Sequence, residues 1–243
     1  LVKSLILENA DEAISKSEIN QSLTISDSAN NSRVFAAKAN LSEKSFVDLD
    51  LSGATFFKAN LRNANFNGAN LEGVDFRSSD LTGASFNNAN LNNAIFSFAK
   101  LDGIDISQES FSNIGLSKID LRNADISNLD LSNRDLSHAN LSNQNLKNHD
   151  LSTTNLKGTD LSHTILPNDL SGHDFRSTKF YGTDLTGRNF SESNISYSIF
   201  DNADLTGADF FRTKVVDSDF SKAKSLAGAN LSHASFTYSN LSG

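Results

Sequence analysis

The sequence contains no cysteine, no methionine and no tryptophan, and it has one proline in 243 residues. The absence of cysteine excludes disulfide bonds and thiolate metal sites. No apolar run approaches the length of a membrane span, and no basic-then-apolar signal segment stands at the start. Acidic residues outnumber basic ones, for a net charge of −8. This balance disfavours direct binding to nucleic acid, which needs a basic face.

Apolar residues are also scarce, at 37% of the chain, which is low for a globular protein. A thin, elongated domain with a narrow core explains that composition. Because the chain begins at Leu1 and contains no methionine, we expect it to be an excerpt from a longer protein.

What the chain does contain is a five-residue repeat. From Ala39 to Phe96 the successive units read ANLSE, KSFVD, LDLSG, ATFFK, ANLRN, ANFNG, ANLEG, VDFRS, SDLTG, ASFNN, ANLNN and AIFSF. The central residue of the unit recurs in phase from Leu41 to Leu166, from Leu170 to Phe220 and from Leu226 to Leu241. All 41 central residues are Leu, Phe, Ile or Val. This central side chain therefore points into a dry core.

A period of five fits neither the helical period of 3.6 nor the strand period of 2. Four short extended sides joined by tight turns close a square coil of 20 residues, and such coils stack about 4.8 Å apart. Residues 20 apart then form columns. Leu41 and its successors make a leucine column, while Phe46 and Phe56 each begin a phenylalanine column.

The repeat resembles the pentapeptide-repeat family, whose consensus is A(D/N)LXX, over residues 39–243. The resemblance implies an all-β fold, a right-handed quadrilateral (four-sided) parallel β-helix solenoid, here of about ten coils. It also implies that the central residue and the residue two places before it both face inward.

Residues 1–34 lie outside the repeat, and we expect an N-terminal cap or a flexible segment there. Asn9 is placed to cap a short helix that contains Asp11 and Lys16. The β-helix is predicted for residues 35–243. Its phase slips by one residue at 166–170, beside Pro167, and by one residue in the other sense at 220–226.

The inward place before the centre is small in the first coils and larger further on. Six residues break the small-residue rule at this place, and we expect them to tilt outward at the corners with their stems covering the core. They are Glu109, Arg134, Gln144, His149, His173 and Arg188.

The sequence predicts no enzyme, no metal site and no cofactor. Ser-His pairs such as Ser137-His138 fall on the two outward places of a unit, so the repeat alone explains them. The five histidines show no ligand spacing. No nucleophile, base and orienting acid are assembled by the pattern.

Acidic residues concentrate in residues 101–137, where the net charge is −4. One interpretation is structural, because an Asp before the centre is the consensus residue and accepts turn hydrogen bonds. The other is an acidic belt that binds a basic protein partner. The residues of this acidic belt are Asp105, Asp120, Asp125, Asp130 and Asp135.

Two functions compete on this sequence. The first is a non-enzymatic protein-interaction scaffold, including a repeat domain of a larger secreted bacterial effector. The second, implied by the family resemblance, is a DNA mimic that binds the type II topoisomerase gyrase and protects it from quinolones. The modest acidity, the lack of a loop insertion and the lack of a C-terminal dimerisation helix favour the first. We expect a bacterial protein, in the cytoplasm unless it is a secreted effector.

The last coil offers a further contact. Leu231, Phe236 and Leu241 would present an apolar centre and unpaired backbone groups at its end, and such an edge favours pairing. We expect either a continuation of the natural chain or a weak C-terminal end-to-end homodimer.

Overall fold

The computed structural model describes residues 25–26, 32–33, 36–106 and 109–241. These residues divide into two compact units. Unit 1 contains the chain up to Gly115 together with Ile119–Leu129, and unit 2 contains Leu116–Lys118 together with the chain from Asp130.

Every regular side of a coil ends in a tight turn that follows the central residue. In the first such turn the N–H of Ala39 donates to the carbonyl of Ala36 at 3.2 Å, and the third residue, Lys38, has φ of 61°. A positive φ at this place characterises a type II turn. Asparagine, histidine and glycine recur there because they adopt the left-handed conformation most readily.

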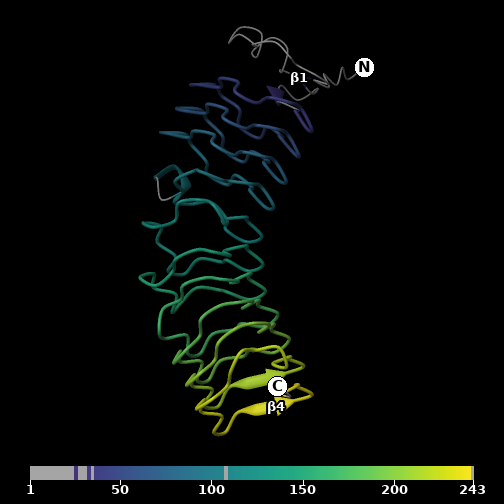
Figure 1. Cartoon of the computed structure of the whole chain (residues 1–243). Helices are drawn as coiled ribbons and strands as arrows, with labels where there is room; N and C mark the ends of the chain where they lie inside the picture. Colours follow the sequence, from purple (N-terminus) through teal and green to yellow (C-terminus); the bar gives the residue numbers. More distant parts are fainter. Residues whose placement is uncertain (1–24, 27–31, 34–35, 107–108, 242–243) are drawn as a thin grey trace. The chain divides into compact units, whose positions relative to one another are not determined.

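Successive coils are joined by isolated parallel bridges rather than by long strands. Leu61 donates its N–H to the carbonyl of Asp80 at 2.8 Å, and Asp80 donates to the carbonyl of Ala59 at 3.0 Å. The bridges of unit 1 join residues 20 apart, as Asn40 with Asn60 and Ser45 with Asn65. Four bridge columns per 20-residue coil confirm the four-sided β-helix, whose stacked coils are visible within each unit (Figure 1).

Two phenylalanine columns fill the core of unit 1. Phe66 stacks between Phe46 and Phe86, with ring centroids 4.7 and 5.1 Å away. It also meets Phe56 and Phe76 edge to face, at 5.9 and 5.6 Å. The inward place beside these rings is mostly alanine. The buried alanines at this place of unit 1 are Ala39, Ala54, Ala59, Ala64, Ala69, Ala84, Ala89, Ala94, Ala99 and Ala124.

The N-terminal part of unit 1 contains a short antiparallel pair, β1 (Ile25–Ser26) with β2 (Ser32–Arg33). The helix expected from Asp11 to Lys16 lies outside the described residues. The proposed boundary at residue 34 therefore stays a prediction.

Unit 1 departs from the repeat at η1, a 3-10 helix at Glu109–Phe111. The repeat assigns Glu109 to the inward place, and glutamate is almost never buried without a partner. The apolar core nevertheless continues, because the Phe111 ring packs on Phe86 at 5.4 Å and on Phe96 at 5.9 Å.

Unit 2 fills the same inward place with hydroxyl groups. Thr183 is 1% exposed, and its Oγ1 donates to the carbonyl of Leu161 in the neighbouring coil at 2.8 Å. Nine further hydroxyls make the equivalent bond at 2.7–3.3 Å, from Thr154, Thr159, Thr164, Thr178, Ser193, Ser198, Thr213, Ser218 and Ser239. We call these ten contacts the hydroxyl ladder.

Bridge spacing in unit 2 changes at two places. It is 20 residues for Asn140 with Asp160 but 19 for Asp160 with Lys179, across Leu166–Leu170. It becomes 21 for Asp204 with Ser225, across Phe220–Leu226. The last bridges lengthen into β3 (Lys214–Val216), which pairs in parallel with β4 (Ser235–Thr237).

The expectation that His173 turns outward is wrong. Its side chain is buried, with 8% of the residue exposed. Nε2 lies 2.7 Å from the carbonyl oxygen of Leu151 and Nδ1 lies 2.9 Å from that of Ser171, and the ring stacks on Phe175. In either neutral tautomer the ring has one N–H, which donates to one of these two carbonyls. That hydrogen bond and the stacking on Phe175 accommodate the ring inside rather than at a corner.

Candidate interaction surfaces

The residue before each central position points outward and usually fixes the turn that follows. Asp130 accepts a hydrogen bond from the N–H of Ser132 at 2.9 Å. Asp125 accepts from both the N–H and the Oγ of Ser127, at 3.0 and 2.8 Å. Asp and Asn favour such places because the side chain bonds to the backbone two residues on. These hydrogen bonds therefore support the structural interpretation of these carboxylates.

The residues of the predicted acidic belt fall in both units. In unit 1, Asp105 and Asp125 are bridge partners in one column, while Asp120 lies opposite Lys100 in another. In unit 2, Asp130 lies near Asp150. Asp135, also in unit 2, accepts from the N–H of Ser137 at 3.0 Å and from Asn155 Nδ2 at 2.9 Å.

Several outer carboxylates carry an arginine two residues on. Asp75 and Arg77, Asp120 and Arg122, and Asp174 and Arg176 form such pairs. In the first pair Nε and Nη2 of the guanidinium donate to the two carboxylate oxygens at 2.9 and 2.7 Å. This two-point contact fixes the direction of both side chains.

Turn hydrogen bonds also govern the charge of these groups. The N–H of Ser127 holds the pKa of Asp125 below its usual value, and that of Ser132 does the same for Asp130. For Asp75 the main cause of the lowered pKa is the hydrogen bond from Arg77. These carboxylates are therefore ionised at neutral pH and fixed in place.

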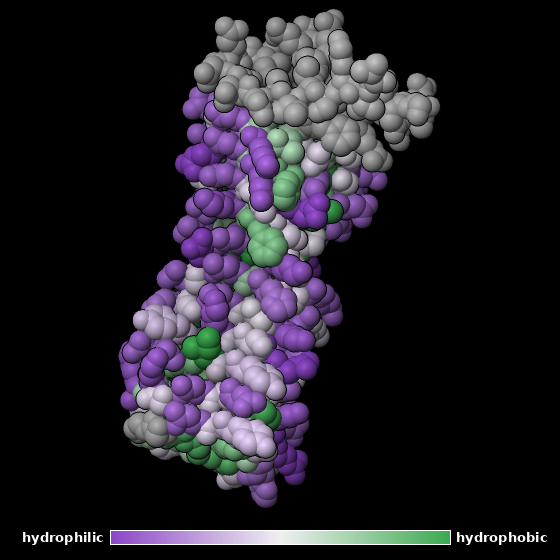
Figure 2. Space-filling model, turned by 90° about the vertical axis from the view of Figure 1, so that its right-hand side faces the viewer, coloured by the Kyte–Doolittle hydropathy of each residue, from purple (hydrophilic) through white to green (hydrophobic). Residues whose placement is uncertain are grey.

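The predicted end-to-end contact residues belong to the last coil of unit 2. Leu231 and Leu241 are 39% and 42% exposed. Phe236 is half-buried, in β4, and meets Phe220 edge to face with the ring centroids 6.0 Å apart. Apolar atoms gather at the lower end of unit 2 in Figure 2. The end-to-end contact stays a prediction.

The described histidines are dispersed. His163 meets the ring of Tyr181 edge to face, and His233 meets Phe211 in the same way. Across residues 36–106 and 109–241, no group of three or more His, Cys, Asp or Glu is placed to hold a metal ion. The described part of the chain also has no helix long and apolar enough to cross a membrane.

Sequence reasoning missed the large side chains at outward turn positions. Phe98, Tyr197 and Tyr238 occupy the positive-φ place of their turns and are 63%, 55% and 85% exposed. Tyr181 is 44% exposed in the turn before Gly182. On the face shown in Figure 2, apolar side chains are scattered among hydrophilic ones. Reading the outward places for aromatic residues would have found them.

Comparison with known proteins identifies the repeat. The pentapeptide-repeat family profile matches eight copies, over residues 37–73, 69–108, 135–168, 189–224 and 225–243. Among curated protein sequences no significant match was found.

Two solved structures show partial similarity. The plasmid-mediated fluoroquinolone resistance protein QnrB1, in a trypsin-treated variant form, is 19% identical, with 81% of this chain and 86% of that one covered and a TM-score of 0.30. HetL of Nostoc sp. strain PCC 7120, involved in heterocyst differentiation regulation, is 23% identical, with 84% and 87% covered and a TM-score of 0.22. The family profile matches more than half of the chain, and the repeat builds the four-sided β-helix described above: the chain belongs to the pentapeptide-repeat family.

Proposed function

We propose that this chain is a non-enzymatic interaction scaffold that binds a protein partner with a basic surface through its outer faces. The observation that carries the proposal is that the inward and outward places of each repeat have different roles. The two inward places are used for packing, whereas the outward places present ordered polar and charged side chains. Such repeated outward places form an extended surface, as in other solenoids.

Fixed carboxylates favour a basic partner. The turn hydrogen bonds of Asp125 and Asp130 keep these groups ionised and hold them in one direction. A carboxylate that is already fixed loses little conformational entropy when it binds a cation. Charge of one sign on a surface also steers an oppositely charged partner.

The test replaces Asp120, Asp125, Asp130 and Asp135 together by Asn. Asparagine keeps the turn acceptor and removes four charges. A matched control replaces Asp184, Asp204, Asp209 and Asp219, which also precede central residues, by Asn. Affinity purification from a cell lysate at a fixed salt concentration should lose the partner with the first variant and keep it with the control. Equal recovery with both would show that these four carboxylates serve only the turns.

The DNA-mimic alternative is separated from this proposal by a gyrase supercoiling assay. A DNA mimic should inhibit supercoiling and rescue gyrase from quinolones, and the quadruple variant should lose both effects. A scaffold for another basic partner should leave supercoiling unchanged.

A further inference from the structure

Unit 1 contains a break in its backbone ladder that leaves a space between two coils. Ser85, Asn90 and Ile95 each form a bridge with the preceding coil, to Asn65, Asn70 and Asp75. No described residue forms the corresponding bridge on their other side. Only the fourth column continues, through Lys100 and Asp120.

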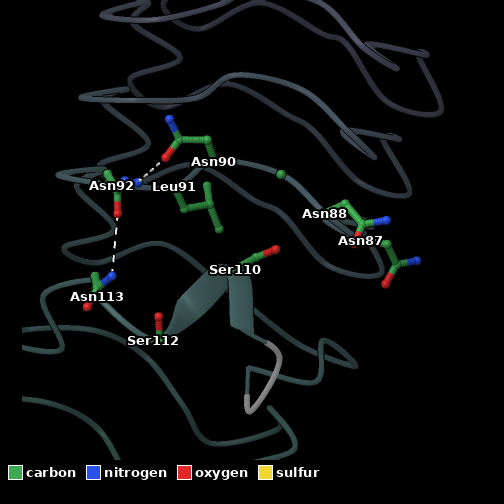
Figure 3. Close-up of a pocket in the computed structure, with 9 residues that line it drawn as sticks. Asn87, Asn88, Asn90, Leu91, Asn92, Ser110, Ser112 and Asn113 are labelled. Atoms are coloured by element: carbon green, nitrogen blue, oxygen red, sulfur yellow. Dashed lines mark hydrogen bonds between the residues drawn. The ribbon is translucent and has the colours of Figure 1, made fainter.

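The space is a cavity of about 640 Å³ lined by Asn87, Asn88, Ala89, Asn90, Leu91, Asn92, Ser110, Ser112 and Asn113. We call it the notch. Asparagines of one coil line one wall, and η1 and Asn113 line the other (Figure 3). Two side-chain hydrogen bonds span it, from Ser110 Oγ to the Phe86 carbonyl at 3.0 Å and from Asn113 Nδ2 to Asn92 Oδ1 at 3.5 Å.

The preceding coil shows which backbone groups lose their ladder partner at the notch. There, Leu71 and Gly73 donate their N–H groups to the carbonyls of Asn90 and Asn92, both at 2.8 Å, and Asn90 donates to the carbonyl of Ala69 at 2.9 Å. One coil further on, the equivalent groups are the N–H of Leu91, the N–H of Asn93 and the carbonyl of Ala89. None of these three has a backbone partner among the described residues.

We propose that the notch binds an extended, uncharged peptide segment of a partner protein, which adds to unit 1 as one further parallel strand. Two donors and one acceptor, arranged as the preceding coil arranges them for residues 90–92, match the backbone of an extended chain. The lining has no charged side chain, so a neutral segment enters at the least desolvation cost. The volume lies within the range of about 300–1,000 Å³ usual for ligand sites.

The proposed peptide site rests on the interaction role proposed above, but it does not depend on the acidic belt. The experiment therefore leaves every aspartate unchanged, and the two proposals fail separately. The probe is the acetylated and amidated peptide Ala-Asn-Leu-Asn-Asn, a copy of residues 89–93.

The measurement is amide hydrogen exchange by NMR on the whole chain, without and with the peptide. In the free protein, Leu91 and Asn93 should exchange about tenfold or more faster than Leu71 and Gly73, because an amide outside the ladder has little protection. The peptide should slow Leu91 and Asn93 by a similar factor. Equal protection of all four amides in the free protein would overturn the proposal, as would no response to the peptide at millimolar concentration.

Two matched pairs of controls fix the binding mode. A peptide N-methylated at its second residue lacks the donor for Ala89 and should not bind, whereas methylation at the third residue should be tolerated. Binding of both peptides alike would rule out strand addition.

Ser112→Trp should block the notch, and Ser52→Trp, at the same place of an earlier coil, should not. Protection that rises with protein concentration alone would mean that a second copy of this chain is the occupant, and would overturn the assignment to a partner.

Discussion

The two units share one backbone design but fill the inward place before the central residue differently. Unit 1 places alanine there, beside two stacked columns of phenylalanine rings. Unit 2 places threonine or serine at many of these positions, and the hydroxyl ladder joins neighbouring coils. A carbonyl oxygen has two lone pairs. In unit 1 most central carbonyls accept only a turn N–H, and those of Phe76 and Phe86 also accept a serine hydroxyl. In unit 2 the carbonyls of the hydroxyl ladder accept a hydroxyl from the neighbouring coil.

This difference teaches that the repeat constrains the volume of the inward place more than its polarity. A small apolar residue fits beside a ring, and a hydroxyl fits where a carbonyl of the next coil is within reach. Both solutions keep the interior closely packed, and each rung of the hydroxyl ladder gives its hydroxyl a carbonyl acceptor. His173 extends the same logic, since its ring N–H has a carbonyl oxygen within reach in either neutral tautomer.

The largest effect should come from the ring column of unit 1. Phe66→Ala removes a ring that contacts four others, and we expect a loss of about 3–5 kcal/mol in the free energy of unfolding. Chemical denaturation measures it. A loss below about 1 kcal/mol would mean that the rings stack without supporting the core.

A smaller effect should follow from removing one rung of the hydroxyl ladder. Thr183→Val keeps the shape of the side chain and deletes the donor to Leu161. We expect a loss of about 1 kcal/mol, measured by the same denaturation. The Leu161 carbonyl keeps its bond from the N–H of Thr164, so a loss as large as that of Phe66→Ala would contradict this account.

Acid should weaken the same paired motif in both units. Hydrogen bonds from the side chains of Arg77 and Arg176 are the main causes that lower the pKa of Asp75 and Asp174 in the folded chain, from a usual value of 3.8. Because the folded pKa lies below the unfolded one, the stabilisation is complete above the unfolded pKa and is lost as pH falls through the folded pKa. Carboxyl titration by NMR should give midpoints below 3.8 for both. Arg77→Gln should raise the midpoint of Asp75 alone.

The smallest effect should come from an exposed ion pair. Arg62 lies 3.3 Å from Asp80, with half of the arginine side chain exposed. Arg62→Ala should change the free energy of unfolding by less than about 1 kcal/mol. A thermal melt beside that of Phe66→Ala checks the assignment of inward and outward places, because equal shifts would mean that these places are reversed.

Much of the fold could be predicted from the sequence because every five-residue unit shows the same pattern of inward and outward places. The central places such as Phe66 and Leu161, and the bridge columns 20 apart, follow from the period alone. The interior position of His173 could not be predicted, since the number of carbonyl oxygens within reach depends on how two coils meet. In the sequence, Glu109 at an inward place indicates an irregular coil near the notch. The sequence pattern does not predict which bridges are missing there.

The candidate surfaces were predicted less well than the fold. The repeat phase shows that Asp125 and Asp130 point outward, but their turn partners appear only in the structure. The sequence presents the acidic belt as one run of residues, whereas in unit 1 Asp105 and Asp125 share a column and Asp120 lies in another. A side chain's face is set by its place in the coil and not by its distance along the chain.

An exchange of the inward residue between the units tests the central claim most directly. Ala64 and Thr183 occupy the same side of the coil, before Phe66 and before Leu185. Both Ala64→Thr and Thr183→Ala should lower the free energy of unfolding by about 1–3 kcal/mol, the first through overpacking beside a ring and the second through a cavity and a lost hydrogen bond. Denaturation of the two variants and the parent gives the answer. If either substitution leaves the stability unchanged, the inward place is not fitted to its own unit and the account is contradicted.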